Sequence, residues 1–252
     1  MSATTRDQFL GGRLTITQPA KGYRAGVDAV FLAAAVTALP GQSVLELGCG
    51  VGVASLCLQA RVGDLDLIGL EVQPEYATLA RQNALLNGLS MGVVTGDLTD
   101  TPSDLRARQF DHVLANPPYY QRARGTASPK VGRETALGET APLRTWVDAA
   151  VRRMRPKGHM TMIQKADRLP DLIAACDSRL GDLSVLPLVP RSGRAAELVI
   201  LRARKGAGGA FRLLSPKILH IGDRHRIDGD SYVAEISAIL RNSGCFDADW
   251  RK

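Results

Sequence analysis

The 252-residue sequence has few features of a disulfide-rich, metal-binding or membrane protein. Its four cysteines, Cys49, Cys57, Cys176 and Cys245, show neither CxxC nor Cys/His ligand spacing, which argues against a zinc site and against a disulfide framework. No apolar run approaches the roughly 20 residues that cross a bilayer. Residues 1–6 also lack the apolar stretch of a signal peptide. We therefore expect a cytoplasmic protein with reduced thiols, no metal and no membrane partner.

Acidic residues are scarce in two segments of the chain. Residues 121–157 hold nine Lys/Arg against three Asp/Glu, and residues 202–226 hold seven against one. The rest of the chain is net acidic, although the whole carries +7. Positive charge gathered in this way is typical of a surface that binds a polyanion, because neutralising phosphates releases condensed counterions. A basic surface kept for solubility is the alternative.

From residue 43 onward, short β-branched or Leu-rich runs alternate with longer stretches of helical periodicity. This alternation is typical of βαβ units and predicts an α/β protein with a doubly wound, mostly parallel, seven-stranded Rossmann-like sheet. The expected strands are residues 43–47, 66–71, 91–95, 110–115, 158–165, 183–188 and 198–203. The expected helices include residues 53–61, 74–87 and, near the end, 231–241.

Three segments lie outside this alternation. Residues 1–40 are expected to form an N-terminal arm and helix that close over a ligand site, ahead of a core at residues 41–204. Residues 205–252 are expected to form a basic C-terminal extension, and residues 120–140 a loop rich in Gly, Arg and Thr. Because 45% of the residues are hydrophobic, the chain can bury one sizeable core, and we expect a single domain with small additions.

A glycine-rich loop follows the first strand of the predicted core. Leu45-Glu46-Leu47-Gly48-Cys49-Gly50-Val51-Gly52 ends a strand and opens a helix, so its glycines allow a tight turn close to a ligand. Gly48 and Gly50 are expected to clear space for the ligand, and Glu46 to orient the loop or reach an amino group. Cys49 is expected to fill the turn rather than to react. The G-x-G-x-G spacing alone does not identify the ligand.

Two carboxylates follow at the ends of the next two strands. Glu71 stands where it can accept both ribose hydroxyls of an adenosine-containing ligand, a requirement that NAD would also satisfy. Asp97 ends the third strand, where it can accept a hydrogen bond from an adenine amine. Three strand ends would then meet one adenosine. For Asp97 alone, a turn or a helix cap is the alternative.

Asn116-Pro117-Pro118-Tyr119 follows the fourth strand, at the edge where open α/β sheets bind ligands. The Asn116 oxygen and the Pro117 carbonyl can hold both hydrogens of a planar amine, whose lone pair is otherwise delocalised. The prolines stiffen the turn, so these acceptors need little reorganisation. Tyr119 offers a ring on which a base can stack. A turn that merely ends the strand is the alternative.

Together these residues resemble the class I S-adenosylmethionine-dependent methyltransferases that carry an Asn-Pro-Pro-Tyr motif, over residues 14–203. Gly22-Tyr23-Arg24, followed by Asp28, is similar to the segment before the first strand in bacterial tRNA(Val) (adenine-N6)-methyltransferases. Leu219-His220 and residues 228–232 are similar to the tail of the same family. Phe31 departs from the usual Leu, which affects packing rather than chemistry.

The resemblance implies methyl transfer from S-adenosylmethionine to the exocyclic amine of an adenosine in RNA, expected to be tRNA next to the anticodon. It implies that the arm closes over the cofactor and shapes the substrate pocket. The expected catalytic residues are Asn116, Pro117 and Tyr119. The expected cofactor-binding residues are Glu46, Gly48, Gly50, Glu71, Asp97, Asn116 and Asp28. The expected substrate-binding residues are Tyr23, Arg24 and Tyr119, with Arg122, Arg124, Lys130 and Arg133 on phosphates.

Other interpretations remain open at this point. Tyr23 and Asp28 could cap and pack the helix at residues 29–38 instead of serving the site. A protein glutamine methyltransferase could use the same motif, because a side-chain amide is also planar; only about 40 residues precede the first strand, where those enzymes usually have a helical domain. A ribosomal RNA guanine methyltransferase would usually carry a second, degenerate half. A non-catalytic RNA-binding protein would be expected to lose some of Asn116, Glu71 and Asp97.

Overall fold

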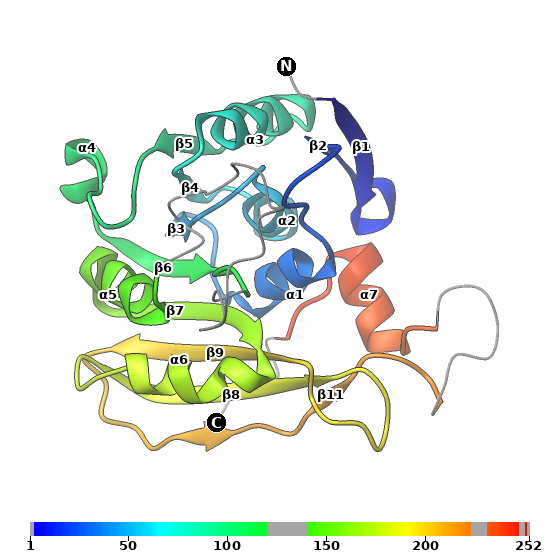
Figure 1. Ribbon diagram of the computed structural model, residues 1–252, viewed down its shortest axis with the longest axis vertical. Helices are drawn as coiled ribbons and strands as arrows, with labels where there is room; N and C mark the ends of the chain where they lie inside the picture. Colours follow the sequence, from blue (N-terminus) through cyan, green and yellow to red (C-terminus); the bar gives the residue numbers. More distant parts are fainter. Residues whose placement is uncertain (1–2, 120–140, 223–230, 247–249, 251–252) are drawn as a thin grey trace, which may run out of the picture.

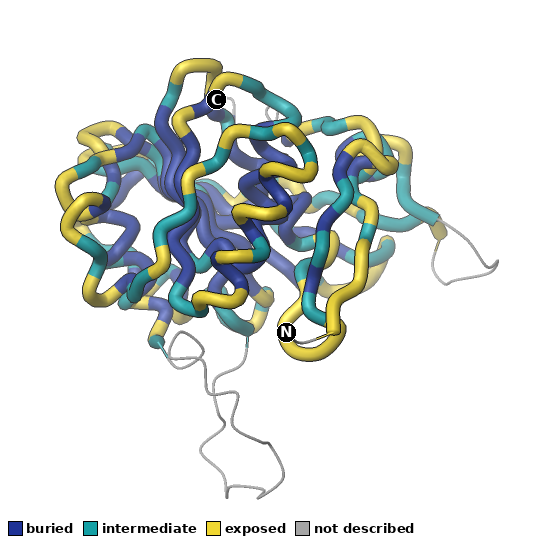
Figure 2. The backbone as a smooth tube through the Cα atoms, turned by 90° about the horizontal axis from the view of Figure 1, so that it is seen from above, coloured by how far each residue is buried: buried dark blue, intermediate teal, exposed yellow. Residues whose placement is uncertain are grey.

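The computed structural model describes residues 3–119, 141–222, 231–246 and 250. A central sheet crosses the molecule and helices cover both of its faces (Figure 1). Buried residues gather in the strands and in the inward sides of the helices, while the rim is exposed (Figure 2). Within this described part, no helix is long and apolar enough to cross a membrane.

The sheet contains all seven predicted strands, so the predicted fold class is confirmed. They are β3 (Ser43–Leu47), β4 (Asp66–Glu71), β5 (Gly92–Thr95), β6 (Phe110–Ala115), β7 (Met154–Lys165), β8 (Leu180–Val189) and β9 (Leu198–Lys205). Their order across the sheet is β8-β9-β7-β6-β3-β4-β5, and β9 runs antiparallel to both of its neighbours. The remaining neighbours in this order are parallel, as the alternation of strands and helices requires.

The strand count differs from the prediction. Two short strands, β10 (Arg212–Leu213) and β11 (Lys217–Ile218), pair with β8, so the described sheet has nine strands rather than seven. The chain after β9 returns along the outer edge of β8, where it satisfies backbone groups that an edge strand leaves unpaired. Two-residue strands of this kind leave no periodic pattern in the sequence.

The helices form two layers. α1 (Val27–Ala35), α2 (Val53–Val62) and α7 (Ala234–Asn242) share one hydrophobic cluster on one face, with α1 and α7 side by side (Figure 1). α5 (Leu143–Arg153), α6 (Leu169–Ala175) and the single turn α4 (Ser103–Arg106) pack in a second cluster on the other face. α3 (Pro74–Leu86) begins at the predicted proline and ends just before Gly88.

The N-terminal arm contains a hairpin that the sequence analysis did not predict. β1 (Thr4–Phe9) and β2 (Leu14–Pro19) pair antiparallel around a 3-10 turn, η1 (Leu10–Gly12). Asn83 on α3 accepts from the Thr17 N–H at 2.8 Å and donates to the Thr17 carbonyl at 3.0 Å. Asn87 bonds both backbone groups of Thr15 in the same way. The arm is therefore fixed to the core next to the glycine-rich loop, which precedes α2.

Two stacked histidines predict a pH-dependent stability. His112 on β6 and His159 on β7 have ring centroids 5.5 Å apart, and burial lowers their pKa values to about 3 and about 4. Since an unfolded His titrates near pH 6.5, the unfolded chain binds more protons below that pH. The free energy of unfolding should therefore fall as the pH drops from 6.5 to 5, by up to about 1.4 kcal/mol per pH unit for each proton.

Urea denaturation of the wild type and two variants at pH 7 and pH 5 measures this effect. The variant His159→Gln should lose part of the slope, whereas the control Asn242→Ala, which changes an exposed side chain that does not titrate, should keep it. Glu46 contributes in the opposite direction, because its raised pKa increases the free energy of unfolding as the pH falls. All three proteins contain Glu46, so its contribution cancels when their slopes are compared. Equal slopes in all three proteins would refute the assignment.

Candidate active site

Four neighbouring parallel strands end at one edge of the sheet and bring the predicted residues together there. The register pairs Leu47 with both Leu70 and Ala115, and Glu71 with Thr95. The loop after β3, the end of β4, the turn after β5 and the motif after β6 are therefore neighbours. This is the edge at which open α/β sheets bind ligands.

Glu71 connects the end of β4 to the glycine-rich loop. One of its carboxylate oxygens accepts from the Gly50 N–H and the other from the Gln73 N–H, each at 2.8 Å. Burial raises the pKa of this carboxyl. Each carboxylate oxygen has a second lone pair, so Glu71 can accept ribose hydroxyls while it holds the loop. Its place agrees with the predicted cofactor role.

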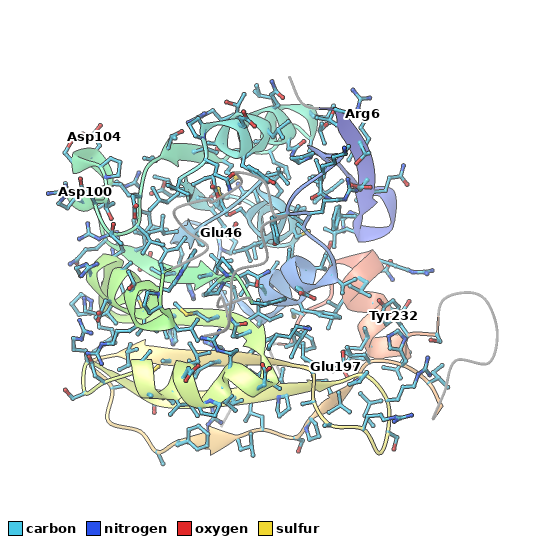
Figure 3. The ribbon with its side chains drawn as sticks, viewed as in Figure 1. Arg6, Glu46, Asp100, Asp104, Glu197 and Tyr232 are labelled. Carbon is cyan, nitrogen blue, oxygen red and sulfur yellow. The ribbon has the colours of Figure 1, made fainter. Side chains whose placement is uncertain are left out.

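Glu46 lies near the middle of the molecule (Figure 3), on β3 and almost fully buried. It accepts hydrogen bonds from the Ser55 N–H at 3.0 Å and from the Ser55 hydroxyl at 2.5 Å. Burial raises the pKa of Glu46 to about 8. These bonds fasten the first turn of α2 to β3. Of the two roles predicted for Glu46, they favour the one that orients the loop. Ser55 is a supporting residue that the sequence analysis missed.

The glycines of the loop serve different neighbours. Gly48, Gly50 and Gly52 all have positive φ, which favours glycine. A Cβ at Gly48 would lie 2.7 Å from the ring of Trp146 on α5, so this glycine makes room for a core side chain. A Cβ at Gly50 would meet only the Tyr23 ring, at an ordinary 3.6 Å. Of the two predicted glycines, Gly50 is the one next to the arm.

Replacing Gly48 by Ala should destabilise the fold by about 2–5 kcal/mol, because the strained backbone adds to the collision with Trp146. Gly88→Ala is the matched control, since its φ of +61° resembles the +65° of Gly48 and nothing lies within 4 Å of its added Cβ. That control should cost only about 1–2 kcal/mol. Thermal unfolding of both variants measures the difference, and equal losses would show that Trp146 is not the obstacle.

The turn after β5 is built by Asp97. Its Oδ1 accepts from the Thr99 N–H at 2.7 Å and from the Thr99 hydroxyl at 2.8 Å. The turn role, one of the two that the sequence allowed, is thus present. Both bonds use the same oxygen and fix the carboxylate of Asp97 at the end of the strand. The preceding residue, Gly96, donates its N–H to the Glu71 carbonyl, so Asp97 lies next to Glu71.

The side chain of Asn116 ends in a buried oxygen at this edge of the sheet. Its side-chain Oδ1 is buried and has no hydrogen-bond partner among the described residues. Buried acceptors in folded proteins almost always have a partner. An unpaired amide oxygen at the end of β6 therefore points to a donor that comes from a ligand.

The Pro117 carbonyl is held by a residue that the sequence analysis missed. Gln164, fully buried near the end of β7, donates from Nε2 to the Pro117 oxygen at 3.2 Å. Its own Oε1 accepts from the Lys165 N–H at 2.9 Å. A carbonyl oxygen has two lone pairs, so Pro117 can accept from a ligand as well. A polar residue directly after Met162 and Ile163, at the end of a buried strand, was the available signal.

Tyr119 joins the motif to the N-terminal arm. Its hydroxyl donates to Asp28 Oδ2 at 2.5 Å, across 91 positions of sequence. Burial and the Asp28 carboxylate raise the pKa of Tyr119, while the Asn116 side chain acts in the opposite direction. Lys165 Nζ lies 5.4 Å from the centre of the Tyr119 ring. Asp28, predicted as a cofactor residue, thus holds the predicted stacking residue in this structure.

The two other predicted arm residues, Tyr23 and Arg24, lie in different places. Tyr23 lies against Gly50 and is 51% exposed. Partial desolvation, followed by the nearby carboxylates Glu46, Asp28 and Glu71, raises its pKa. It therefore stands on the cofactor side of the edge. Arg24 instead forms an ion pair with Asp7 at 2.6 Å and donates to Thr5 and the Pro19 carbonyl, within the hairpin. In this structure the guanidinium holds the arm together, and its substrate role stays a prediction.

The predicted phosphate contacts Arg122, Arg124, Lys130 and Arg133 lie outside the described residues. Cys49 is buried in the turn and burial raises its pKa well above the usual value, as expected of a residue that fills space. In the described residues, no cluster of three or more His, Cys, Asp or Glu could hold a metal ion.

The edge as a whole fits a nucleoside-type cofactor with an amino-acid part. It offers carboxylate acceptors at two strand ends, Glu71 and Asp97, a backbone loop without side chains at Gly50, and an unsatisfied amide oxygen at Asn116. Ribose hydroxyls, an exocyclic amine and an ammonium group are all hydrogen-bond donors, which is the complement that such acceptors require.

Comparison with known proteins also points to a methyltransferase. A family model described as the methyltransferase small domain matches residues 25–172. The chain is 30% identical over 196 residues to the tRNA1(Val) (adenine(37)-N6)-methyltransferase of Porphyromonas gingivalis, covering 72% of this chain and 76% of that protein. It is 36% identical over 95 residues to the release factor glutamine methyltransferase of Deinococcus radiodurans, covering 37% of this chain and a third of that protein.

Among solved structures, a predicted O-methyltransferase from Agrobacterium tumefaciens superposes with a TM-score of 0.70 at 23% identity, covering 87% of this chain and 98% of that one. This similarity supports the fold alone. The family model, in contrast, covers more than half of the chain and includes the glycine-rich loop and the Asn116 motif. The chain therefore belongs to the methyltransferase small domain family and is an S-adenosylmethionine-dependent methyltransferase.

Proposed function

We propose that the protein transfers a methyl group from S-adenosylmethionine to the exocyclic amine of an adenosine in RNA, most simply in tRNA next to the anticodon. The observation that carries this proposal is the buried, unpaired Oδ1 of Asn116 beside the Pro117 carbonyl. Two acceptors at one strand end match the two hydrogens of such an amine.

The residues of the edge divide the chemistry between them. Bound S-adenosylmethionine supplies an electrophilic methyl group on a sulfonium. Asn116 Oδ1 and the Pro117 carbonyl each accept one amine hydrogen, which favours a pyramidal nitrogen whose lone pair is available for in-line attack. Gln164 fixes the Pro117 carbonyl in place. The amine sheds its extra proton after transfer, so no strongly basic side chain is required.

Tyr119 is the proposed platform for the target base. Stacking of a base on an aromatic ring contributes about 1–3 kcal/mol in nucleic-acid sites. The bond to Asp28 orients the ring, and the exposed Lys165 beside it can pair with a phosphate of the same nucleotide. Glu71, Asp97 and the loop at Gly50 hold the cofactor in this proposal, with Tyr23 covering it.

In this proposal the arm at residues 1–40 closes the cofactor site, residues 41–204 are the catalytic core and residues 205–252 are a basic extension. The hydrogen bond from Tyr119 to Asp28 supports the role of the arm, because it joins the start of α1 to the catalytic motif. The pairing of β10 and β11 with β8 attaches the extension to the core.

The acceptor is the part of the proposal that most needs a test. Similarity to a tRNA adenine methyltransferase extends over 72% of the chain and favours adenosine. The shorter similarity to a release factor glutamine methyltransferase favours a protein amide as the second candidate. Incubation with radiolabelled S-adenosylmethionine and either total cellular RNA or total protein separates them. We expect label in RNA, and label in protein glutamine alone would overturn the proposal.

The basic residues between positions 120 and 140, which lie outside the described structure, provide a prediction about RNA binding. Replacing Arg122, Arg124, Lys130 and Arg133 by Ala should weaken RNA binding and reduce the slope of log K against log salt by about 3, since each phosphate contact contributes about 0.7–0.9. Affinity for S-adenosylmethionine should not change. Filter binding at several salt concentrations measures the slope, and an unchanged slope would show that these residues do not contact phosphates.

A further inference from the structure

One face of α3 attaches the N-terminal arm to the core. Asn83 bonds both backbone groups of Thr17 on β2, and Asn87 bonds both backbone groups of Thr15. Residues four positions apart lie on the same side of a helix. Strand β2 therefore docks on α3 in a single register, as the closeness of the two elements in Figure 1 also shows.

Asn83 differs from Asn87 in its third bond, which reaches the glycine-rich loop. Its Nδ2 donates to the Val51 carbonyl at 3.0 Å, in addition to the Thr17 carbonyl at 3.0 Å. The corresponding bond of Asn87 goes to the Asn83 carbonyl at 2.7 Å and so stays within α3. Asn83 thus joins three segments that are far apart in the sequence: the loop, α3 and β2.

Both amide hydrogens and the amide oxygen of Asn83 are used in this arrangement. A side-chain amide offers two N–H donors and one oxygen acceptor. The oxygen accepts from the Thr17 N–H at 2.8 Å, and the two donors meet the Thr17 and Val51 carbonyls. An Asp of the same shape would place a second oxygen against two carbonyl oxygens. The side chain is fully buried, so its three bonds fix the geometry tightly.

The register of β2 in turn places the arm over the loop. Gln18, almost fully buried on β2, accepts from the Ala25 N–H at 2.8 Å and donates to the Ala25 carbonyl at 3.2 Å. Tyr23, two positions earlier, has its ring next to Gly50. The Tyr76 hydroxyl on α3 donates to the Tyr23 carbonyl at 3.2 Å. A shift of β2 along α3 would therefore move the Tyr23 ring away from the loop.

We propose that Asn83 is a positioning residue of the cofactor site. Through the Val51 carbonyl it fixes the glycine-rich loop, and through Thr17 it fixes the arm whose Tyr23 lies over that loop. Two sides of the site are then in place before the cofactor binds, which reduces the ordering that binding must impose. The inference rests on the proposed function, in which this loop holds S-adenosylmethionine.

Replacing Asn83 by Ala should weaken S-adenosylmethionine binding about tenfold, because the loop loses the bond that fixes the Val51 carbonyl. Calorimetric titration measures the affinity, and thermal unfolding verifies that the variant is folded. In steady-state methylation of total RNA, KM for S-adenosylmethionine should rise more than kcat falls. A substitution that merely loosened the whole fold would lower kcat as well.

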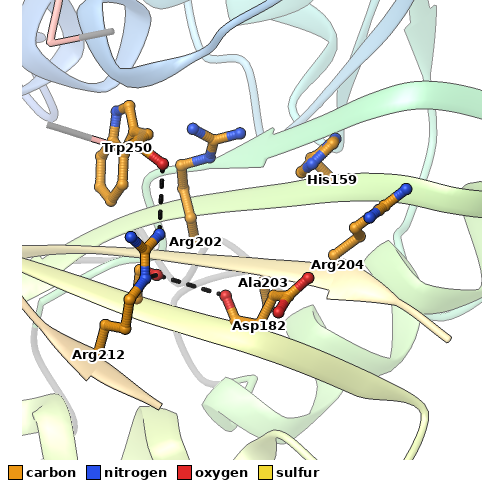
Figure 4. Close-up of a pocket in the computed structure, with 8 residues that line it drawn as sticks. His159, Asp182, Arg202, Ala203, Arg204, Arg212 and Trp250 are labelled. Atoms are coloured by element: carbon orange, nitrogen blue, oxygen red, sulfur yellow. Dashed lines mark hydrogen bonds between the residues drawn. The ribbon is translucent and has the colours of Figure 1, made fainter. Parts of the chain in front are cut away.

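Asn87→Ala is the matched control. It removes the same side chain from the same face of α3 and breaks the same pair of bonds to β2, but it leaves the bond to Val51 intact. This variant should lose stability and bind S-adenosylmethionine nearly as the wild type does. Arg204→Gln is a remote control, since Arg204 lines a pocket at the opposite end of the sheet from β4 and β5 (Figure 4). It should keep the wild-type affinity.

Hydrogen exchange of the wild type measures the same connection without a substitution. Binding of S-adenosylmethionine should slow exchange in the glycine-rich loop and also in β2, although no proposed cofactor residue lies on β2. Protection that is confined to the loop would contradict the inference. This measurement decides the question even if Asn83→Ala does not fold.

Wild-type cofactor affinity in a folded Asn83→Ala protein, or an equal loss of affinity in Asn87→Ala, would also overturn the inference. The variant Glu71→Gln acts on the same loop without Asn83 and separates this failure from that of the proposed function. If Glu71→Gln weakens cofactor binding and Asn83→Ala does not, the inference alone is wrong. Unchanged affinity in both variants would contradict the proposed cofactor role of the loop as well.

Discussion

Replacing Asn116 by Ala is expected to lower kcat by about 10²–10³, the loss seen when one preorganised hydrogen-bonding group is removed from a reacting centre. The affinity for S-adenosylmethionine should stay unchanged. The reason is that Asn116 Oδ1 has no partner within the described protein, so its proposed partner is the acceptor amine. Single-turnover kinetics give the rate, and calorimetric titration gives the cofactor affinity.

The matched control for this experiment is Asn242→Ala, which removes the same side chain from the exposed end of α7. It should react at the wild-type rate. Asn116 was predicted both as a catalytic and as a cofactor-binding residue, and the two measurements separate these roles. A variant that loses cofactor binding together with turnover would assign Asn116 to the cofactor or to the turn.

Replacing Glu71 by Gln is expected to weaken S-adenosylmethionine binding by about 10²-fold, since hydrogen bonds to a charged group contribute about 1.5–3 kcal/mol. The carboxylate has two tasks in this account. It accepts from the Gly50 and Gln73 N–H groups, and it is placed to accept ribose hydroxyls. An amide retains only one acceptor oxygen, and its NH₂ group would face a backbone donor.

Glu75→Gln is the control for this substitution, because Glu75 is exposed at the start of α3, four positions away. Cofactor affinity in that variant should equal the wild-type value. Circular dichroism verifies that the Glu71 variant keeps its fold, and its melting temperature reports the effect of the loosened loop. Unchanged cofactor affinity in a folded Glu71→Gln protein would remove Glu71 from the cofactor site.

Most of the core could be predicted because its signals are local. A buried strand appears in the sequence as a short apolar run, and a glycine, a proline or a polar residue marks its end. For this reason β3, β4 and β6 have the predicted boundaries. The alternation of strands and helices predicts parallel strands, and the carboxyl ends of parallel strands form the edge at which the site residues meet. Local chemistry also explains Asp97, whose turn was one of the two roles that the sequence allowed.

The features that sequence reasoning missed depend on distant partners. The ring of Trp146, almost 100 positions later in the chain, lies beside Gly48, and no local pattern indicates that contact. The ion pair of Arg24 with Asp7 depends on the hairpin, which the sequence analysis did not predict. The bond from Gln164 to the Pro117 carbonyl depends on the pairing of β6 with β7, and no periodicity within one segment records that register.

The position of the methyl group in the product tests the central claim most directly. Total tRNA from cells that lack the protein would be incubated with the purified protein and S-adenosylmethionine, digested to nucleosides and analysed by mass spectrometry. The account predicts new N6-methyladenosine, formed by the wild type and by Asn242→Ala and absent with Asn116→Ala. Methylated guanosine in place of N6-methyladenosine, or equal product from Asn116→Ala, would contradict it.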